Sequence, residues 1–477
     1  MNIRYKYNKL SLAIALVVNP LFVNAQFEAS IEVNALNGSN GFVINGAVTG
    51  DFMGGSVSYA GDINGDGTDD LLIGAAGTDP NGNLSGSSYL ILGSVVGFPA
   101  SVAISTTTTF NGVSGGDSSG RSVSNAGDIN GDGIYDFITG AYKASANGNT
   151  FSGKSYIVFG DTGRFNSTIN LSTLDGSNGF KINGVQQFDV SGFSVASAGD
   201  INGDGIDDVI IGAVYGDAGF GYDSGGSYVV FGSTNSFASS LDLSALNGSN
   251  GFVMVRNRNG EQAGISVHSA GDFNNDGIDD VIIGANRVIN NANGNTVGAG
   301  YIVFGNSNGF SSVLQLSDLN GNNGFILNGI ADGDNTGFTV SHAGDVNGDG
   351  IDDVIIGADQ VDTNGVDSGA SYVVFGSSSG FNSSFNLSDL NGNNGFVING
   401  IVADDFSGTS VSNAGDINAD GIDDLIIGAK NVDTNGINAG ASYVVFGISS
   451  GFNDIFKLSD LNGNNGFPSM GWRRVIC

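Results

Sequence analysis

Short apolar runs, bounded by glycine, asparagine and serine, recur along the whole chain. They are of two kinds, one of three aliphatic residues and one that begins with tyrosine. Examples of the first kind are residues 71–73, 209–211 and 425–427, and examples of the second are residues 89–92, 228–231 and 443–446. Continuous runs of this length are typical of strands buried on both faces of a sheet. Because no stretch of ten residues or more has a 3.6-residue apolar period, we expect almost no helix.

The apolar runs belong to a repeating unit that also contains two other predicted strands. One is Ser-Val-Ser, and the other is Gly-Phe-Val-Ile-Asn-Gly, as at residues 41–46 and 395–400. Four short strands per unit, repeated around an axis, are typical of a β-propeller, whereas the rungs of a β-solenoid are normally shorter than this unit. We therefore predict an all-β propeller of six four-stranded blades, with a seventh blade that begins but is cut short.

A nine-residue polar loop follows the Ser-Val-Ser strand in every unit, and successive loops start 66, 72, 72, 73 and 71 residues apart. Positions 1, 3, 5 and 9 are Asp, Asn, Asp and Asp in all six loops, and position 6 is Gly. In a tightly curled loop these side chains and the carbonyl of position 7 supply the several oxygens that Ca²⁺ prefers. The predicted ligands are Asp62, Asn64, Asp66, Thr68 and Asp70; Asp128, Asn130, Asp132, Ile134 and Asp136; Asp200, Asn202, Asp204, Ile206 and Asp208; Asp272, Asn274, Asp276, Ile278 and Asp280; Asp345, Asn347, Asp349, Ile351 and Asp353; and Asp416, Asn418, Asp420, Ile422 and Asp424.

The alternative for these loops is a plain turn, since Asp, Asn and Gly all favour chain reversals. A turn needs one or two such residues, whereas three carboxylates held together repel one another unless a cation offsets their charge. An EF-hand is excluded because position 12 is a strand isoleucine, such as Ile73 or Ile211, and not glutamate. Mg²⁺ demands stricter octahedral geometry. We expect about six calcium ions, one per repeat, with a structural role.

The net charge of −32 excludes nucleic acid as a partner, because such a surface repels phosphate. The acidic residues are almost all aspartate, since glutamate occurs only at Glu28, Glu32 and Glu261. Aspartate is the short carboxylate that suits turns and cation loops. The charge is therefore expected to be organised around metal.

The N-terminus predicts export. Arg4, Lys6 and Lys9 precede an apolar stretch at residues 10–18, and Val23-Asn24-Ala25 forms a small-residue cleavage site. This pattern indicates a signal peptide over residues 1–25. An uncleaved membrane anchor is the alternative, but Asn19 and Pro20 make the apolar run short for a span. We expect a secreted or cell-surface protein without a transmembrane segment after cleavage.

The loops and their flanking strands resemble the FG-GAP repeats of the integrin α-chain propeller. The shared features are the Asp-x-Asn-x-Asp-Gly-x-x-Asp loop, the Ile-Ile-Gly-Ala that follows it and the preceding Phe-Ser-Gly or Gly-Phe-Ser. The resemblance covers residues 27–467, within a predicted propeller domain of residues 26–467. It implies calcium loops on one rim of the propeller. It also implies an extracellular adhesion or ligand-binding role, with a protein or glycan partner.

The C-terminus departs from that family, whose propellers have seven blades. A seventh unit begins at Leu461-Asn-Gly-Asn-Asn-Gly-Phe467 and then changes to an unrelated tail over residues 468–477, which holds the only Trp and the only Cys. This pattern indicates truncation or a frameshift. If the ring closes as it stands, we expect Phe42–Gly46 to serve as the outer strand of blade six. Otherwise a seventh blade is missing and a sheet edge is exposed.

Catalytic motifs are missing from the sequence. The two histidines, His268 and His342, precede Asp loops and are interpreted as strand-end residues and not general bases. We find no nucleophile elbow, zinc motif or phosphate loop. The expected role is a non-enzymatic binding module that presents variable loops such as Ala76–Gly86 and Asp217–Gly225. The alternatives are the propeller of a secreted phospholipase D-like hydrolase and a structural spacer.

Overall fold

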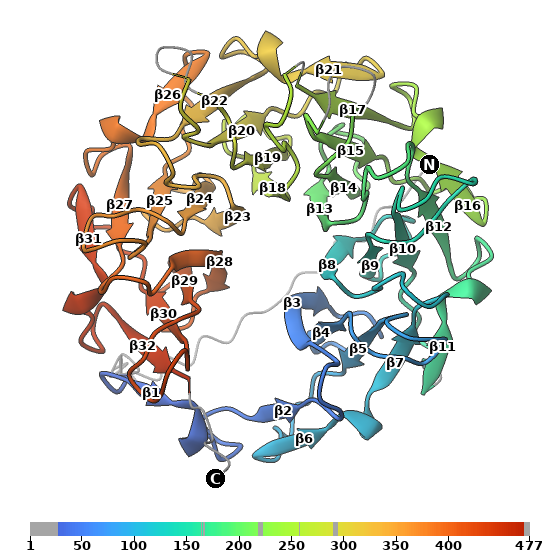
Figure 1. Cartoon of the computed structure of the whole chain (residues 1–477), viewed down its shortest axis with the longest axis horizontal. Helices are drawn as coiled ribbons and strands as arrows, with labels where there is room; N and C mark the ends of the chain where they lie inside the picture. Colours follow the sequence, from blue (N-terminus) through green and yellow to red (C-terminus); the bar gives the residue numbers. More distant parts are fainter. Residues whose placement is uncertain are drawn as a thin grey trace, which may run out of the picture.

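Six five-stranded sheets stand around a central axis as the blades of a propeller (Figure 1). The structure is a computed structural model that describes residues 27–163, 165, 167–217, 223–256, 258–289 and 294–471. The predicted signal peptide and residues 472–477 of the predicted tail lie outside the described residues. The predicted all-β propeller with six blades is confirmed, and a short fifth strand joins the four strands predicted for each sheet.

The strands occupy equivalent positions in blades one to six, counted from the central axis outward. The first strands are β3 (Met53–Gly61), β8 (Ser122–Gly127), β13 (Ser194–Gly199), β18 (Ser266–Gly271), β23 (Thr339–Gly344) and β28 (Ser407–Gly415). The second strands are β4 (Asp70–Ala75), β9 (Asp136–Ala141), β14 (Asp208–Ala213), β19 (Asp280–Ala285), β24 (Asp353–Ala358) and β29 (Asp424–Ala429). The third strands are β5 (Ser87–Ile91), β10 (Lys154–Val158), β15 (Gly226–Val230), β20 (Ala299–Val303), β25 (Ala370–Val374) and β30 (Ala441–Val445).

The two outer strands of each blade come from the next repeat in the sequence, except that blade six takes its fifth strand from the N-terminal end. The fourth strands are β7 (Thr108–Asn111), β12 (Gly179–Asn183), β17 (Gly251–Val255), β22 (Gly324–Asn328), β27 (Gly395–Asn399) and β32 (Gly466–Met470). The fifth strands are β11 (Thr168–Asn170), β16 (Ser240–Asp242), β21 (Val313–Gln315), β26 (Ser384–Asn386), β31 (Ile455–Lys457) and β1 (Ile31–Glu32). The first four strands pair antiparallel and the fifth pairs parallel to the fourth, as in blade five.

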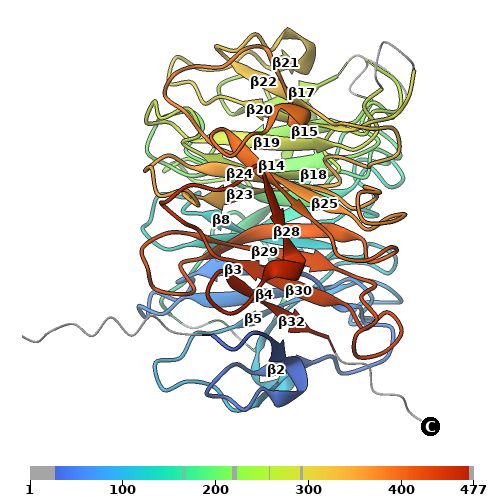
Figure 2. The same cartoon turned by 90° about the vertical axis from the view of Figure 1, so that its left-hand side faces the viewer.

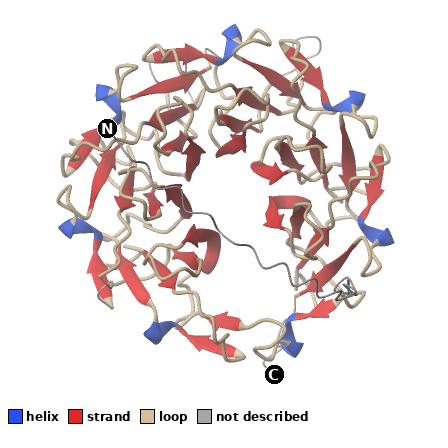
Figure 3. Ribbon diagram, turned by 180° about the vertical axis from the view of Figure 1, so that it is seen from behind, coloured by secondary structure: helices blue, strands red, loops and turns tan. Residues whose placement is uncertain are grey.

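Among the described residues, helix is confined to single 3₁₀ turns on the outer rim (Figure 3). They are η1 (Val33–Ala35), η2 (Ile104–Thr106), η3 (Leu171–Thr173), η4 (Leu243–Ala245), η5 (Leu316–Asp318), η6 (Leu387–Asp389) and η7 (Leu458–Asp460). In the described part of the chain, no helix has the length and apolar character needed to cross a membrane.

The hydrophobic core lies between neighbouring blades. Second strands such as β14 and β24 are buried along their whole length, as the continuous apolar runs predict. Each of the five interfaces from blade one to blade six is a separate cluster of buried apolar residues. The interfaces leave no room for side chains at some glycines: a Cβ on Gly140 would lie 2.1 Å from the carbonyl oxygen of Gly192 in the next blade. The glycine of the Ile-Ile-Gly-Ala run therefore sets the spacing between blades.

The outer strand of blade six differs from our expectation. We predicted that Phe42–Gly46 would fill this place, but β32 does so, and β1 adds the fifth strand beside it. Pro468 of β32 pairs with Tyr443, and its equivalent in blade five is Val397. The N–H of Val397 bonds outward to Asp454 O, so a proline there loses an outer bond and keeps the pairing with the third strand.

Residues 43–45 instead form β2 (Val43–Asn45), which pairs in parallel with β6 (Ser101–Ala103) in a separate two-stranded sheet. In Figures 1 and 2 this small sheet follows blade six along the outer rim. The rim is therefore continued from blade six by β1, which lies beside β32, and then by the β2–β6 sheet toward blade one.

Candidate functional site

The six Asp-rich loops join the first and second strands of each blade, as predicted. Position 1 directly follows the first strand, and position 9 is the first residue of the second strand; Asp345 and Asp353 are the pair in blade five. All thirty predicted ligand residues therefore lie in equivalent hairpin bends at one face of the ring.

Backbone N–H groups fix the carboxylates of positions 1 and 5. The position-1 carboxylate accepts the N–H of position 5 at 2.8–3.0 Å and the N–H of the position-6 glycine at 2.7–2.9 Å in every loop. The position-5 carboxylate accepts the N–H of position 7 at 2.9–3.1 Å. These bonds curl the loop and hold two negative charges close to each other.

The position-9 aspartate is buried in all six loops. One of its carboxylate oxygens accepts the N–H of the glycine after the third strand at 2.7–3.0 Å. Burial, with a further contribution from the carboxylates at positions 1 and 5, raises the pKa of Asp136, Asp208 and Asp280 to about 8. The same causes raise the pKa of Asp70 to about 6. An anion in such a place is unfavourable unless a cation compensates it.

Loop four contains polar atoms that the protein leaves unsatisfied. Asn274 Oδ1 and Asp280 Oδ2, at positions 3 and 9, are buried without a hydrogen-bond partner among the described residues. In loop three the amide of Asn202 points its nitrogen at Asp208, 3.1 Å from Oδ2. Binding a cation there requires this amide to turn its oxygen inward. The donor set, all oxygen and rich in carboxylate, fits Ca²⁺.

No three His, Cys, Asp or Glu side chains in the described ranges are arranged to hold a metal ion by themselves. The loops offer three carboxylates each, but the position-1 and position-5 groups are turned toward backbone N–H groups. Asparagine and a backbone carbonyl must complete the shell. Calcium binding thus stays a prediction, supported by the unsatisfied oxygens and by the buried, crowded carboxylates.

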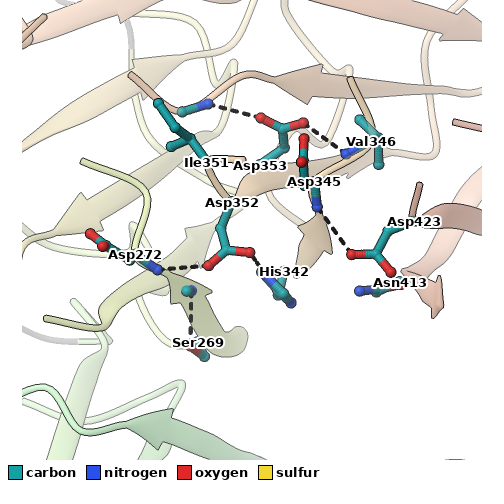
Figure 4. A network of polar contacts seen from close by, with 12 residues as sticks. Ser269, Asp272, His342, Asp345, Val346, Ile351, Asp352, Asp353, Asn413 and Asp423 are labelled. Atoms are coloured by element: carbon teal, nitrogen blue, oxygen red, sulfur yellow. Dashed lines mark hydrogen bonds and ion pairs between the residues drawn. The ribbon is translucent and has the colours of Figure 1, made fainter. Parts of the chain in front are cut away.

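Position 8 of the loop has a role that the sequence did not reveal. Its carboxylate accepts the N–H of position 1 in the preceding blade, as Asp352 does from Asp272 at 2.9 Å and Asp423 from Asp345 at 3.1 Å (Figure 4). Asp207 and Asp279 make the same bond to Asp128 and Asp200, at 2.7 and 2.8 Å. We call this bond the blade latch. It ties the Asp-rich loops of blades two to six together, whereas position 8 of loop two is Tyr135 and makes no such bond to blade one.

The two histidines lie on the innermost strands beside this latch. His342 Nε2 lies 2.9 Å from Asp352 Oδ1, and His268 Nδ1 accepts the backbone N–H of His342 at 3.4 Å. Burial lowers the pKa of His268 to about 4, so this side chain is neutral at physiological pH. Burial raises the pKa of Asp352, but the hydrogen bond from His342 outweighs that effect and the pKa lies below its usual value. Both histidines sit in strands, as we interpreted them.

The opposite face of the ring is built from the connections between second and third strands and between fourth and first strands. Connections of antiparallel strands alternate between the two ends of the strands, so these loops lie away from the Asp-rich loops. We call this surface the loop face. It includes Ala76–Gly86, one of the variable loops that the sequence singled out. Part of the other, residues 218–222, lies outside the described residues.

Large apolar side chains stand exposed on the loop face. Phe52 and Phe188 are 71% and 54% exposed, and Leu84 and Phe151 are also exposed. All four have positive φ, between 52° and 70°, a conformation that bulky residues rarely adopt. The equivalent turn positions Ser118 and Asp223 also have positive φ, so this conformation belongs to the repeat, and the exposed apolar side chains distinguish these loops. The only hint in the sequence was a phenylalanine inside otherwise polar loops.

Comparisons with known proteins agree with this architecture. Four segments, residues 54–91, 119–158, 336–374 and 407–445, match the FG-GAP repeat. They correspond to the three inner strands and the Asp-rich loop of blades one, two, five and six. The chain is also 28% identical over 248 residues to integrin alpha pat-2 of Caenorhabditis elegans. That alignment covers 49% of this chain and 17% of the worm protein.

The matched repeats, the similarity to an integrin α chain and the six radially arranged sheets lead to one assignment. Four of the six blades match the FG-GAP repeat, and the chain is a six-bladed β-propeller that is similar to an integrin α chain.

Proposed function

We propose that the chain is an exported, calcium-stabilised binding module that holds an extracellular protein or glycan on its loop face. The observation that carries this proposal is the set of exposed, bulky side chains at positive φ on that face, including Phe151 and Phe188. Exposed apolar groups rimmed by polar residues mark interaction sites. Aromatic side chains are also enriched where binding energy concentrates.

The calcium loops have the separate role of stiffening the disc. They lie at the other end of the strands, and the blade latch connects loops two to five to the next blade. A cation bound by the folded chain stabilises it by mass action, and extracellular calcium fills even sites with Kd of about 10⁻⁴–10⁻³ M. Calcium in this role holds the loops of the opposite face in a fixed arrangement. The adhesion role that the resemblance to integrin α chains implies is consistent with this kind of module.

A binding screen against matrix proteins and glycans, in saturating calcium, tests the proposal. We expect a saturable ligand whose binding falls at least tenfold in Phe188→Asn and in Phe151→Asn, because asparagine tolerates positive φ and removes the ring. Val96→Asn is the matched control, since Val96 is 90% exposed in a connection at the metal-loop end. A spacer would bind no ligand in the screen. Hydrolysis that persists through purification to homogeneity would instead favour the enzyme accessory domain.

A further inference from the structure

Blade three departs from the repeat at the residue that follows its fourth strand. In the other five blades this residue is a glycine, and a Cβ there would lie 2.0–2.5 Å from a backbone carbonyl oxygen of the same blade. These glycines are Gly112, Gly184, Gly329, Gly400 and Gly471. In blade three the residue after β17 is Arg256. The connection that follows β17 is therefore built differently, to accept a side chain.

The same connection carries a second substitution. The other five connections that lead into a first strand contain an aspartate, whose carboxylate accepts the N–H of the residue three positions before it at 2.9–3.3 Å. The connection between β17 and β18 contains Glu261 instead, and this side chain is fully buried. Its carboxylate pairs with Arg256 Nε at 2.9 Å and with Arg258 Nε at 3.4 Å. The longer acidic side chain and the two arginines thus form one unit.

Arg256 also reaches blade four. Its Nη1 donates a hydrogen bond to the hydroxyl of Tyr301 in β20, and the guanidinium lies 5.4 Å from the centroid of that ring. A blade does not need this bond in order to pack. Tyr156 is the equivalent residue of blade two, and its buried hydroxyl has no hydrogen-bond partner among the described residues. The packing of the tyrosine therefore does not explain the arginine.

The arginine pair has hydrogen-bonding capacity and charge to spare. A guanidinium carries five N–H groups, and Glu261 and Tyr301 each accept one from Arg256. Its Nη2 makes no hydrogen bond to the described residues, and the side chain is 17% exposed. Two guanidinium groups on one carboxylate leave one excess positive charge, in a chain whose net charge is −32. An anion is the ligand that this arrangement favours.

Arg256 lines a cleft between blades three and four, which are neighbours in the ring (Figure 1). The volume of the cleft is about 650 Å³, within the usual range for a small-molecule site. One wall is η5, which follows the outermost strand of blade three and contributes the apolar side chains of Leu316 and Leu319. We call this space the rim cleft.

The opposite wall consists of the two outermost strands of blade four. Asn328 of β22 and Asn386 of β26 are register partners and share a side-chain hydrogen bond of 3.2 Å, and Ser384 adds a hydroxyl. The backbone of β22 is already paired on both sides, with β20 and with β26. A ligand therefore meets side-chain amides and hydroxyls on this wall. These groups match the hydroxyls of a sugar, whereas the carboxylate of a peptide is captured by backbone N–H groups.

We propose that the rim cleft binds an acidic sugar at the end of an otherwise neutral glycan. Arg256 pairs with the sugar carboxylate, Asn328, Ser384 and Asn386 bind ring hydroxyls, and the leucines of η5 contact the carbon atoms of the ring. A glycan charged at every sugar does not fit, because a chain of net charge −32 repels a polyanion. The rim cleft contains none of the exposed phenylalanines of the loop face, so the two sites are tested separately.

The test compares two probes, methyl β-D-glucuronide and methyl β-D-glucoside. They share one ring and differ in having a carboxylate or a hydroxymethyl group on it. Each is titrated into the purified, calcium-loaded chain, and binding is followed by NMR. We expect saturable 1:1 binding of the glucuronide, about tenfold or more tighter than that of the glucoside, the scale of a charge-assisted hydrogen bond.

Variants separate the rim cleft from the general charge of the surface. The double variant Arg256→Gln/Glu261→Gln removes both charges of a pair, so it leaves no buried charge alone, and it should weaken glucuronide binding about tenfold or more. Arg287→Gln is the matched control, since this exposed arginine lies in a nearby connection but does not line the cleft. It should leave the affinity unchanged.

Ser384→Trp tests the cleft without a change of charge. Ser384 is exposed, so this variant should keep the unfolding midpoint of the parent chain while its indole ring fills the cleft and abolishes glucuronide binding. Equal affinity for the two probes would overturn the proposal. Arg287→Gln weakening the glucuronide as much as the double variant, or Ser384→Trp leaving its affinity unchanged, would overturn it too. Tighter binding of an N-acetylated dipeptide with a free carboxylate would show a peptide site and contradict the proposal.

Discussion

The blade latch makes one prediction that the chain can test against itself. Asp279→Ala removes the carboxylate that accepts the N–H of Asp200 at 2.8 Å between blades three and four. Asp69→Ala removes the same loop position in blade one, where the carboxylate is exposed and accepts a hydrogen bond from the Tyr59 hydroxyl of its own blade at 3.2 Å. The two substitutions delete the same atoms from equivalent bends, so the difference between them isolates the latch.

The magnitude follows from what each carboxylate does. A hydrogen bond to a charged group contributes about 1.5–3 kcal/mol, and its loss here leaves a partly buried N–H without a partner. We therefore expect Asp279→Ala to lower the free energy of unfolding by about 1.5–3 kcal/mol. We expect Asp69→Ala to change it by less than about 0.5 kcal/mol, the usual range for a surface substitution.

Urea unfolding, followed by circular dichroism in saturating calcium, measures both changes. Asp279→Asn is a useful third variant because it keeps an acceptor oxygen but no charge, and it should cost less than the alanine. Calcium content of each variant is measured in parallel, since Asp279 adjoins the predicted ligand Asp280. Equal losses for Asp279→Ala and Asp69→Ala, at equal calcium content, would refute the latch.

Three further predictions concern packing and titration. Gly140→Ala should prevent the native spacing of the blades and lower the soluble yield, because its Cβ would lie 2.1 Å from Gly192 O. Gly226→Ala is the control: its Cβ would have no atom nearer than 3.8 Å, so the yield should stay unchanged. Phe27→Ala removes one ring, which stacks on Phe467 at 4.8 Å and is tilted against Phe446 at 5.6 Å between centroids. This variant should lower the free energy of unfolding by about 1–3 kcal/mol and speed proteolysis near β1. An unchanged cleavage rate would contradict the role of β1 in holding the N-terminal segment to blade six. In the presence of chelator, the thermal unfolding midpoint should decrease as the pH rises from 5 to 8. The reason is that the buried position-9 aspartates with pKa about 8 hold protons in the folded chain that the unfolded chain has released. A midpoint that increases over this pH range would contradict the prediction.

The repeat itself made the fold predictable. Apolar runs bounded by glycine, such as residues 209–211, predicted the second strands, and the six loops predicted the number of blades. The fifth strands were missed because segments such as β16, of three residues, have too little apolar pattern to stand out. The outer strand of blade six was wrongly assigned because the residues after Phe467 no longer follow the repeat, whereas residues 468–470 still pair with the third strand.

The candidate site was predictable in part. The hairpin position of each loop followed from the spacing of residues such as Asp200 and Asp208. The blade latch could not be predicted from the sequence, because position 8 looks like one more acidic residue beside the predicted ligand at position 9. Its partner is about 80 residues away in sequence, as Asp352 is from Asp272, and no local pattern marks such a pair. The strained phenylalanines of the loop face also required backbone angles, which the sequence does not encode locally.

Titration of the chelator-stripped chain with calcium tests the central claim most directly, with heat of binding and unfolding midpoint recorded on the same material. Six oxygen-lined bends should take up about six calcium ions, and the unfolding midpoint should rise as they fill. A chain that takes up no calcium and unfolds at the same temperature in chelator and in calcium would contradict the account.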